Sequence, residues 1–110
     1  MLLSTDIWVG ALIRRAELGG AHAVVARKGD PRAGAVLVKV FNPETRAARL
    51  YAEATRMDGD RVWMQPRPSE EEAELDAYVE KAARIDPDVW VVEIEDRQGR
   101  DFLVEPVERS

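Results

Sequence analysis

The sequence has 110 residues, of which 45% are hydrophobic and 34% are charged, proportions typical of a single globular domain rather than a disordered chain. It contains no cysteine and one histidine, which excludes disulfides, thiolate metal sites, cysteine nucleophiles and sites built from two histidines. We therefore expect one domain over residues 1–110, with frayed ends at residues 1–3 and 106–110.

The net charge of −5 is unevenly divided along the chain. Residues 1–55 carry eight basic and five acidic side chains, whereas residues 56–110 carry eight basic and sixteen acidic ones. The acidic second half argues against binding of nucleic acid, which needs clustered lysine and arginine. No apolar run has the length of a membrane span, and the first residues lack the pattern of an export signal. We expect a cytoplasmic protein without a membrane partner.

The first predicted element is a helix over residues 4–18. Its apolar residues recur at three-to-four spacing, and Gly19-Gly20 is a typical helix end. The oxygen-bearing side chains of residues 4–6 are candidates for the N-cap. The β-prone residues 7–9 leave a strand open as the alternative at this point.

Four strands are predicted to follow, over residues 21–27, 35–41, 47–53 and 61–65. The second of them is apolar on both faces apart from Lys39, which is typical of a central strand. The third alternates apolar and polar side chains, a pattern that predicts one buried face and one wet face carrying Tyr51.

A second helix is predicted from Ser69 to residue 84 or 85. Residues 69–72 match a capping box, in which the serine and a glutamate three residues later satisfy backbone N–H groups at the helix start. Pro87 ends the helix, and a strand follows over residues 89–95. The pattern leaves open whether residues 102–104 add another short strand.

The resulting element order is α-β-β-β-β-α-β, with a last β left open. Short turns between consecutive strands predict an antiparallel meander, and so an α+β fold with a mostly antiparallel sheet of four to six strands packed with two helices. The strand that follows the second helix can pair in parallel, because a helix crosses over before it.

Two basic groups are candidate binding sites. Lys28 and Arg32 belong to a loop with Gly29 and Gly34 and form a small basic patch, which makes them candidates for anion binding. The loop lacks the sequence of a P-loop, so a solvated hairpin loop is the alternative. Arg14-Arg15 on the first helix is a candidate contact for an acidic partner or a phosphate. We interpret His22 as structural or incidental, because no serine or cysteine lies near it in the sequence.

An acidic cluster surrounds the last long strand. Paired carboxylates at this spacing can bind Mg²⁺ or act as an acid–base pair, but no third ligand is in register. We therefore predict ion-paired or solvated carboxylates, no metal site, no cofactor and no catalytic residue. The cluster consists of Asp86, Asp88, Glu93, Glu95 and Asp96.

The three tryptophans divide into two kinds. Trp8 and Trp90 fit apolar faces and are predicted core residues. Trp63 has Arg61 and Arg67 nearby and points away from the apolar face of its strand, which makes it a candidate exposed anchor for a partner. The alternative is that Trp63 packs under the second helix.

Three segments together resemble a known family. They are A-L-I-R-R-A-E at residues 11–17, K-G-D at 28–30 followed by A-G-A-V-L-V at 33–38, and D-P-D-V-W-V-V-E at 86–93. They resemble a family of small bacterial proteins, mainly alphaproteobacterial, known as domain of unknown function 1491. The resemblance covers roughly residues 5–104 and implies a stand-alone cytoplasmic bacterial protein without an assigned activity, cofactor or site.

Two classes of function follow from the residues. We favour a non-catalytic interaction domain, since no nucleophile–base pair, metal box or phosphate loop is present. Its partner would be another protein or a second copy of the chain, bound at a sheet edge or at an exposed aromatic residue. The candidate partner-binding residues are Trp63, Arg61, Arg67, Arg14 and Arg15.

The alternative is an enzyme or a nucleic-acid-processing protein that uses carboxylates together with arginine or lysine. It requires Glu93 or Asp96 to meet a cation in one cleft. The cations available for this are Arg14, Arg15, Lys28 and Lys39.

Overall fold

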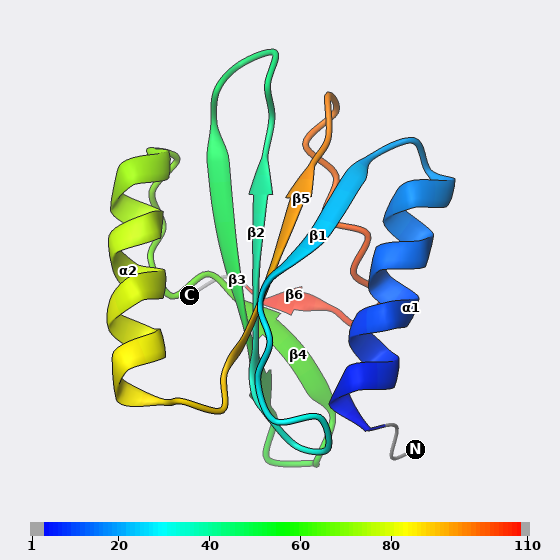
Figure 1. Ribbon diagram of the computed structural model, residues 1–110, viewed down its shortest axis with the longest axis vertical. Helices are drawn as coiled ribbons and strands as arrows, with labels where there is room; N and C mark the ends of the chain where they lie inside the picture. The colour runs from blue at the N-terminus through cyan, green and yellow to red at the C-terminus, as the bar shows by residue number, and fades with distance from the viewer. Residues whose placement is uncertain (1–3, 109–110) are drawn as a thin grey trace.

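The computed structural model describes residues 4–108, so the predicted fraying of residues 1–3 and 109–110 lies outside the described part. Within residues 4–108, eight elements follow one another. They are α1 (Thr5–Leu18), β1 (His22–Arg27), β2 (Val36–Phe41), β3 (Ala48–Thr55), β4 (Arg61–Met64), α2 (Glu72–Ile85), β5 (Trp90–Glu95) and β6 (Val107–Glu108). Figure 1 shows α1 and α2 on opposite sides of one sheet. The predicted α+β class is confirmed. No helix among the described residues is long and apolar enough to cross a membrane.

The sheet is mixed and mostly antiparallel, with the strand order β1-β5-β2-β3-β4-β6. β2, β3 and β4 form the predicted antiparallel meander. The meander does not extend to β1, because β5 lies between β1 and β2 and pairs in parallel with β2. The parallel pairing that the crossover helix permits is thus confirmed, and β2 is central as expected. The insertion of β5 moves β1 to the edge of the sheet.

The sheet buries a separate apolar cluster on each face. Side chains that alternate along β2 and β5 divide between the two clusters, as the period of two predicts. Tyr51, predicted on a wet face, is only 4% exposed, because Phe102 and Val107 from the C-terminal segment pack over the cluster to which it belongs. The α1-side cluster includes Trp8, Leu12, Val36, Val38, Val40, Tyr51, Trp63, Trp90, Val92 and Ile94. The α2-side cluster includes Leu37, Ala48, Leu50, Leu75, Val89 and Val91.

Helix α1 includes residues 7–9, which settles the alternative in favour of helix. Ser4 is the N-cap residue but makes no side-chain capping bond. The backbone N–H groups of Thr5 and Asp6 instead donate to the carbonyls of Arg32 and Pro31, at 3.2 and 2.9 Å. A loop that is distant in sequence therefore satisfies the first turn, which a local capping pattern cannot reveal.

Helix α2 begins at Glu72, three residues later than predicted, with Glu71 as the N-cap. The predicted capping box is therefore wrong. Ser69 lies before the helix, where its hydroxyl accepts the N–H of Glu71 at 3.1 Å and donates to the carboxylate of Glu74 at 3.0 Å. The carbonyl of Glu70 accepts the N–H of Ala48 at 2.9 Å, so this segment is bound to the start of β3 before the helix begins.

The C-terminal segment differs most from the expectation. Residues 102–104 form no strand, and Phe102 has a positive φ of 59°. The last strand is instead β6, which pairs in parallel with β4 at Trp63 and Val107. Residues 107–108, predicted to be frayed, are thus part of the sheet. They are fixed by that pairing and by packing of Val107 against the α1-side cluster.

Candidate functional site

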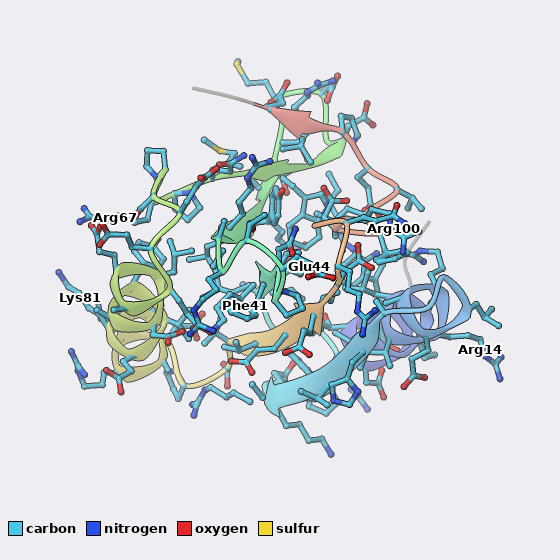
Figure 2. All side chains as sticks on the ribbon, turned by 90° about the horizontal axis from the view of Figure 1, so that it is seen from above. Arg14, Phe41, Glu44, Arg67, Lys81 and Arg100 are labelled. Carbon is cyan, nitrogen blue, oxygen red and sulfur yellow. The ribbon has the colours of Figure 1, made fainter. Side chains whose placement is uncertain are left out.

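The α2 face of the sheet is only partly covered. Helix α2 packs on β3 and β2, and β5 and β1 lie beyond them, toward the lower edge of the sheet in Figure 2. A groove of about 200 Å³ remains beside the helix, which we call the edge groove. Its lining combines apolar side chains with carboxylates from two elements. The lining residues are His22, Val24, Lys39, Phe41, Glu72, Glu93, Ile94 and Glu95.

Strand β1 forms the outer wall of the edge groove and one edge of the sheet. It pairs with β5 alone, so within residues 4–108 no strand binds the backbone groups on its outer side. Val24 and Val25 point to opposite faces, and each is 40% exposed. The register is regular from His22 to Val25 and shifts only before Arg27. Residues 22–25 are therefore a regular and uncovered strand edge that carries two exposed valines.

Lys39 lies at the inner wall of the edge groove, with a side chain only 7% exposed. Its Nζ atom is 2.6 Å from Asp76 Oδ1, 2.9 Å from Glu72 Oε2 and 3.7 Å from Glu93 Oε2. Burial alone lowers the pKa of Lys39, but the carboxylates of Asp76 and Glu72 together raise it above its ordinary value. A lysine held charged in this way is neither a base nor a nucleophile at neutral pH.

The geometric condition set for the enzyme alternative is met by one pair, because Glu93 and Lys39 both line the edge groove. Glu93 does approach Lys39, but Asp96 lies elsewhere, with its carboxylate only 3% exposed and bound by the guanidinium of Arg100. Arg100 Nε and Nη2 donate to the two carboxylate oxygens of Asp96 at 3.0 and 2.9 Å, and these bonds lower the pKa of Asp96. Among residues 4–108, no group of three or more acidic or histidine side chains is placed to hold a metal ion.

The prediction that Trp63 is an exposed anchor is wrong, because the side chain is fully buried. Its ring stacks on Trp8 with centroids 5.3 Å apart. The carboxylate of Glu105 accepts the indole N–H groups of both, at 3.0 Å from Trp63 and 3.2 Å from Trp8. Arg61 lies over the Trp8 ring and pairs with Glu53 at 3.0 Å. These residues hold the C-terminal segment onto the α1 face.

The remaining candidates for partner binding do not gather on one surface. Figure 2 shows Arg14 on the outer side of α1 and Arg67 near α2, on opposite sides of the molecule. Arg67 pairs with Glu74. Arg15 is half-buried, and its Nε donates to the carbonyl of Phe102 at 3.1 Å. Of the arginine pair on α1, one side chain is thus exposed and the other holds the C-terminal segment.

The loop of Lys28 and Arg32 uses its backbone N–H groups internally. The carboxylate of Asp30 accepts the N–H groups of residues 32 and 33, and the N–H of Gly34 donates to the carbonyl of Asp30. The loop also packs on β5, because a Cβ at Gly34 would lie 2.2 Å from the carbonyl of Asp88. An anion site here stays a prediction that rests on the two basic side chains alone.

A second hollow lies on the α1 side and is polar. It has a volume of about 420 Å³ and is lined by Arg49, Tyr51, Gln65, Phe102 and their neighbours. Arg49 also pairs with Glu70 at 3.2 Å, and that hydrogen bond raises the pKa of Arg49. Both cations of its lining, Arg49 and Arg100, are paired with carboxylates.

The sequence interpretation named Glu93 and Lys39 only as part of the enzyme alternative, and it did not single out Val24 or the other partners of Lys39. The signal for Val24 is a strand, HAVVAR, whose consecutive valines point to different faces and are both 40% exposed. The signal for Lys39 is a single cation in an otherwise apolar strand. Its partners Glu72 and Asp76 lie 33 and 37 residues away, so the sequence alone does not pair them.

Comparison with known proteins gives a family and close structural neighbours but no activity. The family model described as "Protein of unknown function (DUF1491)" matches residues 3–104. No curated protein is similar to the chain. The crystal structure of a DUF1491 family protein from Caulobacter crescentus CB15 is 73% identical, with a TM-score of 0.96 over 97% of this chain and 100% of that one.

Two structures determined in solution agree with this result. The NMR structure of a DUF1491 family protein from Caulobacter crescentus CB15 is 73% identical, with a TM-score of 0.92 over 98% of each chain. The solution structure of a protein from A. tumefaciens is 32% identical, with a TM-score of 0.79 over 96% of this chain and 95% of that one. At these identities the neighbours share the fold, including its single sheet between two helices.

Proposed function

We propose that this chain, which belongs to the DUF1491 family, is a non-catalytic interaction domain. The description of that family names no function, so the proposal rests on the surface of the chain itself. The binding surface is the outer edge of β1 together with the edge groove. One observation carries the proposal: residues 22–25 form a regular strand edge with exposed valines on both faces. Exposed edges of this kind readily pair with strands of other chains.

The proposed binding mode is addition of a strand. An extended segment of a partner protein pairs with β1 through backbone hydrogen bonds, and its alternate side chains contact Val24 on one face and Val25 on the other. Backbone pairing supplies affinity, whereas the side chains beside the edge supply selectivity. The cytoplasmic location remains a prediction from the sequence.

Binding is favoured over catalysis by the state of the charged groups. Lys39 and Arg100 are both held by carboxylates, Lys39 by Glu72 and Asp76 and Arg100 by Asp96. The pKa of Lys39 is raised and that of Asp96 is lowered, so both groups stay charged at neutral pH. General acid–base chemistry needs the opposite shifts, toward neutral pH.

Site-specific photo-cross-linking in cells of the source organism tests the proposal. A photoreactive amino acid is placed at Val24 and, as a control, at Met57, an apolar residue of the β3–β4 turn that is more exposed than Val24. We expect a discrete adduct from position 24 and none from position 57. In the variant Val25→Lys the adduct at position 24 should be lost, because a lysine on an edge strand opposes pairing.

Two results would contradict the proposal. One is the absence of an adduct at position 24 in cells that contain folded protein. The other is equal labelling from positions 24 and 57, which indicates collision rather than a binding surface. Thermal unfolding of Val25→Lys serves as the folding control, with a change of less than about 1 kcal/mol expected for a partly exposed edge position.

A further inference from the structure

The edge groove is strongly acidic. Its lining carries three carboxylates, from Glu72, Glu93 and Glu95, against one lysine, Lys39, and the carboxylate of Asp76 also pairs with that lysine. Glu95 is exposed and has no ion pair among the described residues, and it also borders a neighbouring hollow that Arg97 and Arg100 line. Carboxylates thus outnumber lysine and arginine side chains in the lining of the edge groove, directly beside the strand edge.

The register of β1 on β5 places this charge within reach of an added strand. His22 lies opposite Glu95, and Val24 lies opposite Glu93, so these side chains share the α2 face. A strand added outside β1 lies about 4.8 Å farther out. Because Val24 is short, the aliphatic stem of a lysine or arginine from that strand can lie across it and bring the charged end to Glu93 or Glu95.

We propose that the segment bound at β1 is a cationic strand of a partner protein, with apolar residues alternating with lysine or arginine on the side of the edge groove. This inference rests on the proposed function and names the chemistry of the partner. The attraction is confined to the end of β1 near His22, because Arg27 and Lys28 make the other end positive.

A second copy of the chain fits this surface less well. Antiparallel pairing of two β1 strands leaves the α2 faces of both copies on the same side of the joined sheet. The two acidic grooves then lie near each other and repel. Pairing along a strand of six residues also buries less surface than a stable dimer normally does.

Titration of the ¹⁵N-labelled full chain with two capped hexapeptides tests the inference by NMR. One peptide alternates valine and lysine, and the other alternates valine and glutamate. We expect the lysine peptide to shift the amide signals of residues 22–27 and to bind at least about threefold more tightly than the glutamate peptide, with a preference that decreases as salt is added.

Matched charge reversals identify the groups responsible. Glu95→Lys replaces an attraction by a repulsion without removing a known ion pair, so the lysine peptide should bind about tenfold more weakly. Asp60→Lys makes the same charge change in the β3–β4 turn, where it should leave the affinity within about twofold, since that turn is at the other side of the sheet.

The outcomes separate this inference from the proposed function. Equal shifts of the β1 amides by both peptides would overturn the cationic partner and leave strand addition intact. An adduct at position 24 in cells, without any β1 shift by the lysine peptide, would do the same. Light scattering that finds a dimer through β1 would assign the edge to a second copy and overturn the inference, whereas failure of both the cross-linking and the peptides would overturn both proposals.

Discussion

Replacement of Glu105 by glutamine tests how the C-terminal segment is held on the α1 face. Glu105 accepts the indole N–H of Trp63 through one carboxylate oxygen and that of Trp8 through the other. The amide of glutamine has one acceptor oxygen, and an NH2 donor group takes the place of the other oxygen, so one indole N–H loses its partner and faces another donor. Because the Trp63 ring is fully buried, water cannot replace the lost bond there.

The size of the effect follows from these contacts. A hydrogen bond to a charged group contributes about 1.5–3 kcal/mol, and an unsatisfied buried donor costs about 1–3 kcal/mol. Glu105 itself is half-buried, so hydration offsets part of the loss. We expect Glu105→Gln to lower the free energy of unfolding by about 2 kcal/mol at pH 7, and by about 1 kcal/mol in a Trp8→Phe background, where one acceptor suffices.

The effect also depends on pH. Burial raises the pKa of Glu105, but the hydrogen bonds from Trp63 and Trp8 together bring it below its ordinary value of 4.5. A lowered folded-state pKa means that the stabilisation is fully present above the unfolded pKa and is lost as the pH falls through the folded pKa. The difference between wild type and Glu105→Gln should therefore shrink below about pH 4.5.

Urea unfolding at several pH values measures these differences, and the indole N–H signals in NMR spectra locate them. The Trp63 and Trp8 signals should move, whereas the signal of Trp90, which donates to the carbonyl of Asp30 at 2.7 Å, should stay in place as an internal control. A change in stability of less than about 0.5 kcal/mol at pH 7, or an equal change in the Trp8→Phe background, would refute this account of Glu105.

Three further variants, each measured by urea unfolding, test other parts of the molecule. Lys39→Met should lower the free energy of unfolding by about 1 kcal/mol, because the carboxylate partners of Lys39 are about half exposed and stay hydrated. The pKa of Lys39 is raised in the folded state, so the stabilisation that Lys39 provides should persist at neutral pH and disappear only above the ordinary pKa of 10.5. Gly34→Ala should cost about 2–3 kcal/mol, because its Cβ would meet the carbonyl of Asp88 at 2.2 Å; no change would mean that the loop yields easily. Asp96→Asn should lower the free energy of unfolding by about 2 kcal/mol at pH 7, because it weakens the hydrogen bonds from Arg100. The pKa of Asp96 is lowered in the folded state, so the difference in stability from wild type should disappear below the ordinary pKa of 3.8.

The parts of the fold that follow from local patterns were predictable. Helical spacing and strand alternation identify α1, β2 and β5 within a residue or so, and the apolar character of β2 on both faces predicts its central position. The position of β1 was not predictable in this way. It depends on whether β5 pairs with β2 or with another strand, and packing across the whole sheet determines that pairing.

The candidate site shows the same limit. Trp63 has arginines nearby in the sequence, which favours an exposed ring, but its N–H is satisfied by Glu105, 42 residues away. β6 has two residues and follows a proline, so it has no periodicity to detect. Ser69 and Glu72 match a capping box, yet the carbonyl of Glu70 accepts the N–H of the distant Ala48 and the helix begins only at Glu72. In each case a contact distant in sequence outweighs the local preference.

The two edges of the sheet differ in how well they are protected against pairing with other strands, and this difference bears on function. On the far side, β4 is covered by β6, which is too short to accept a long strand, and the residue before it, Pro106, has no N–H to donate. The C-terminal segment held by Glu105 adds to that protection. β1 has none of these features from His22 to Val25, where the backbone is regular and no other strand of the described residues lies outside it. A chain that protects one edge of its sheet and leaves the other exposed beside a groove of carboxylates has the asymmetry expected of a surface that binds a partner strand.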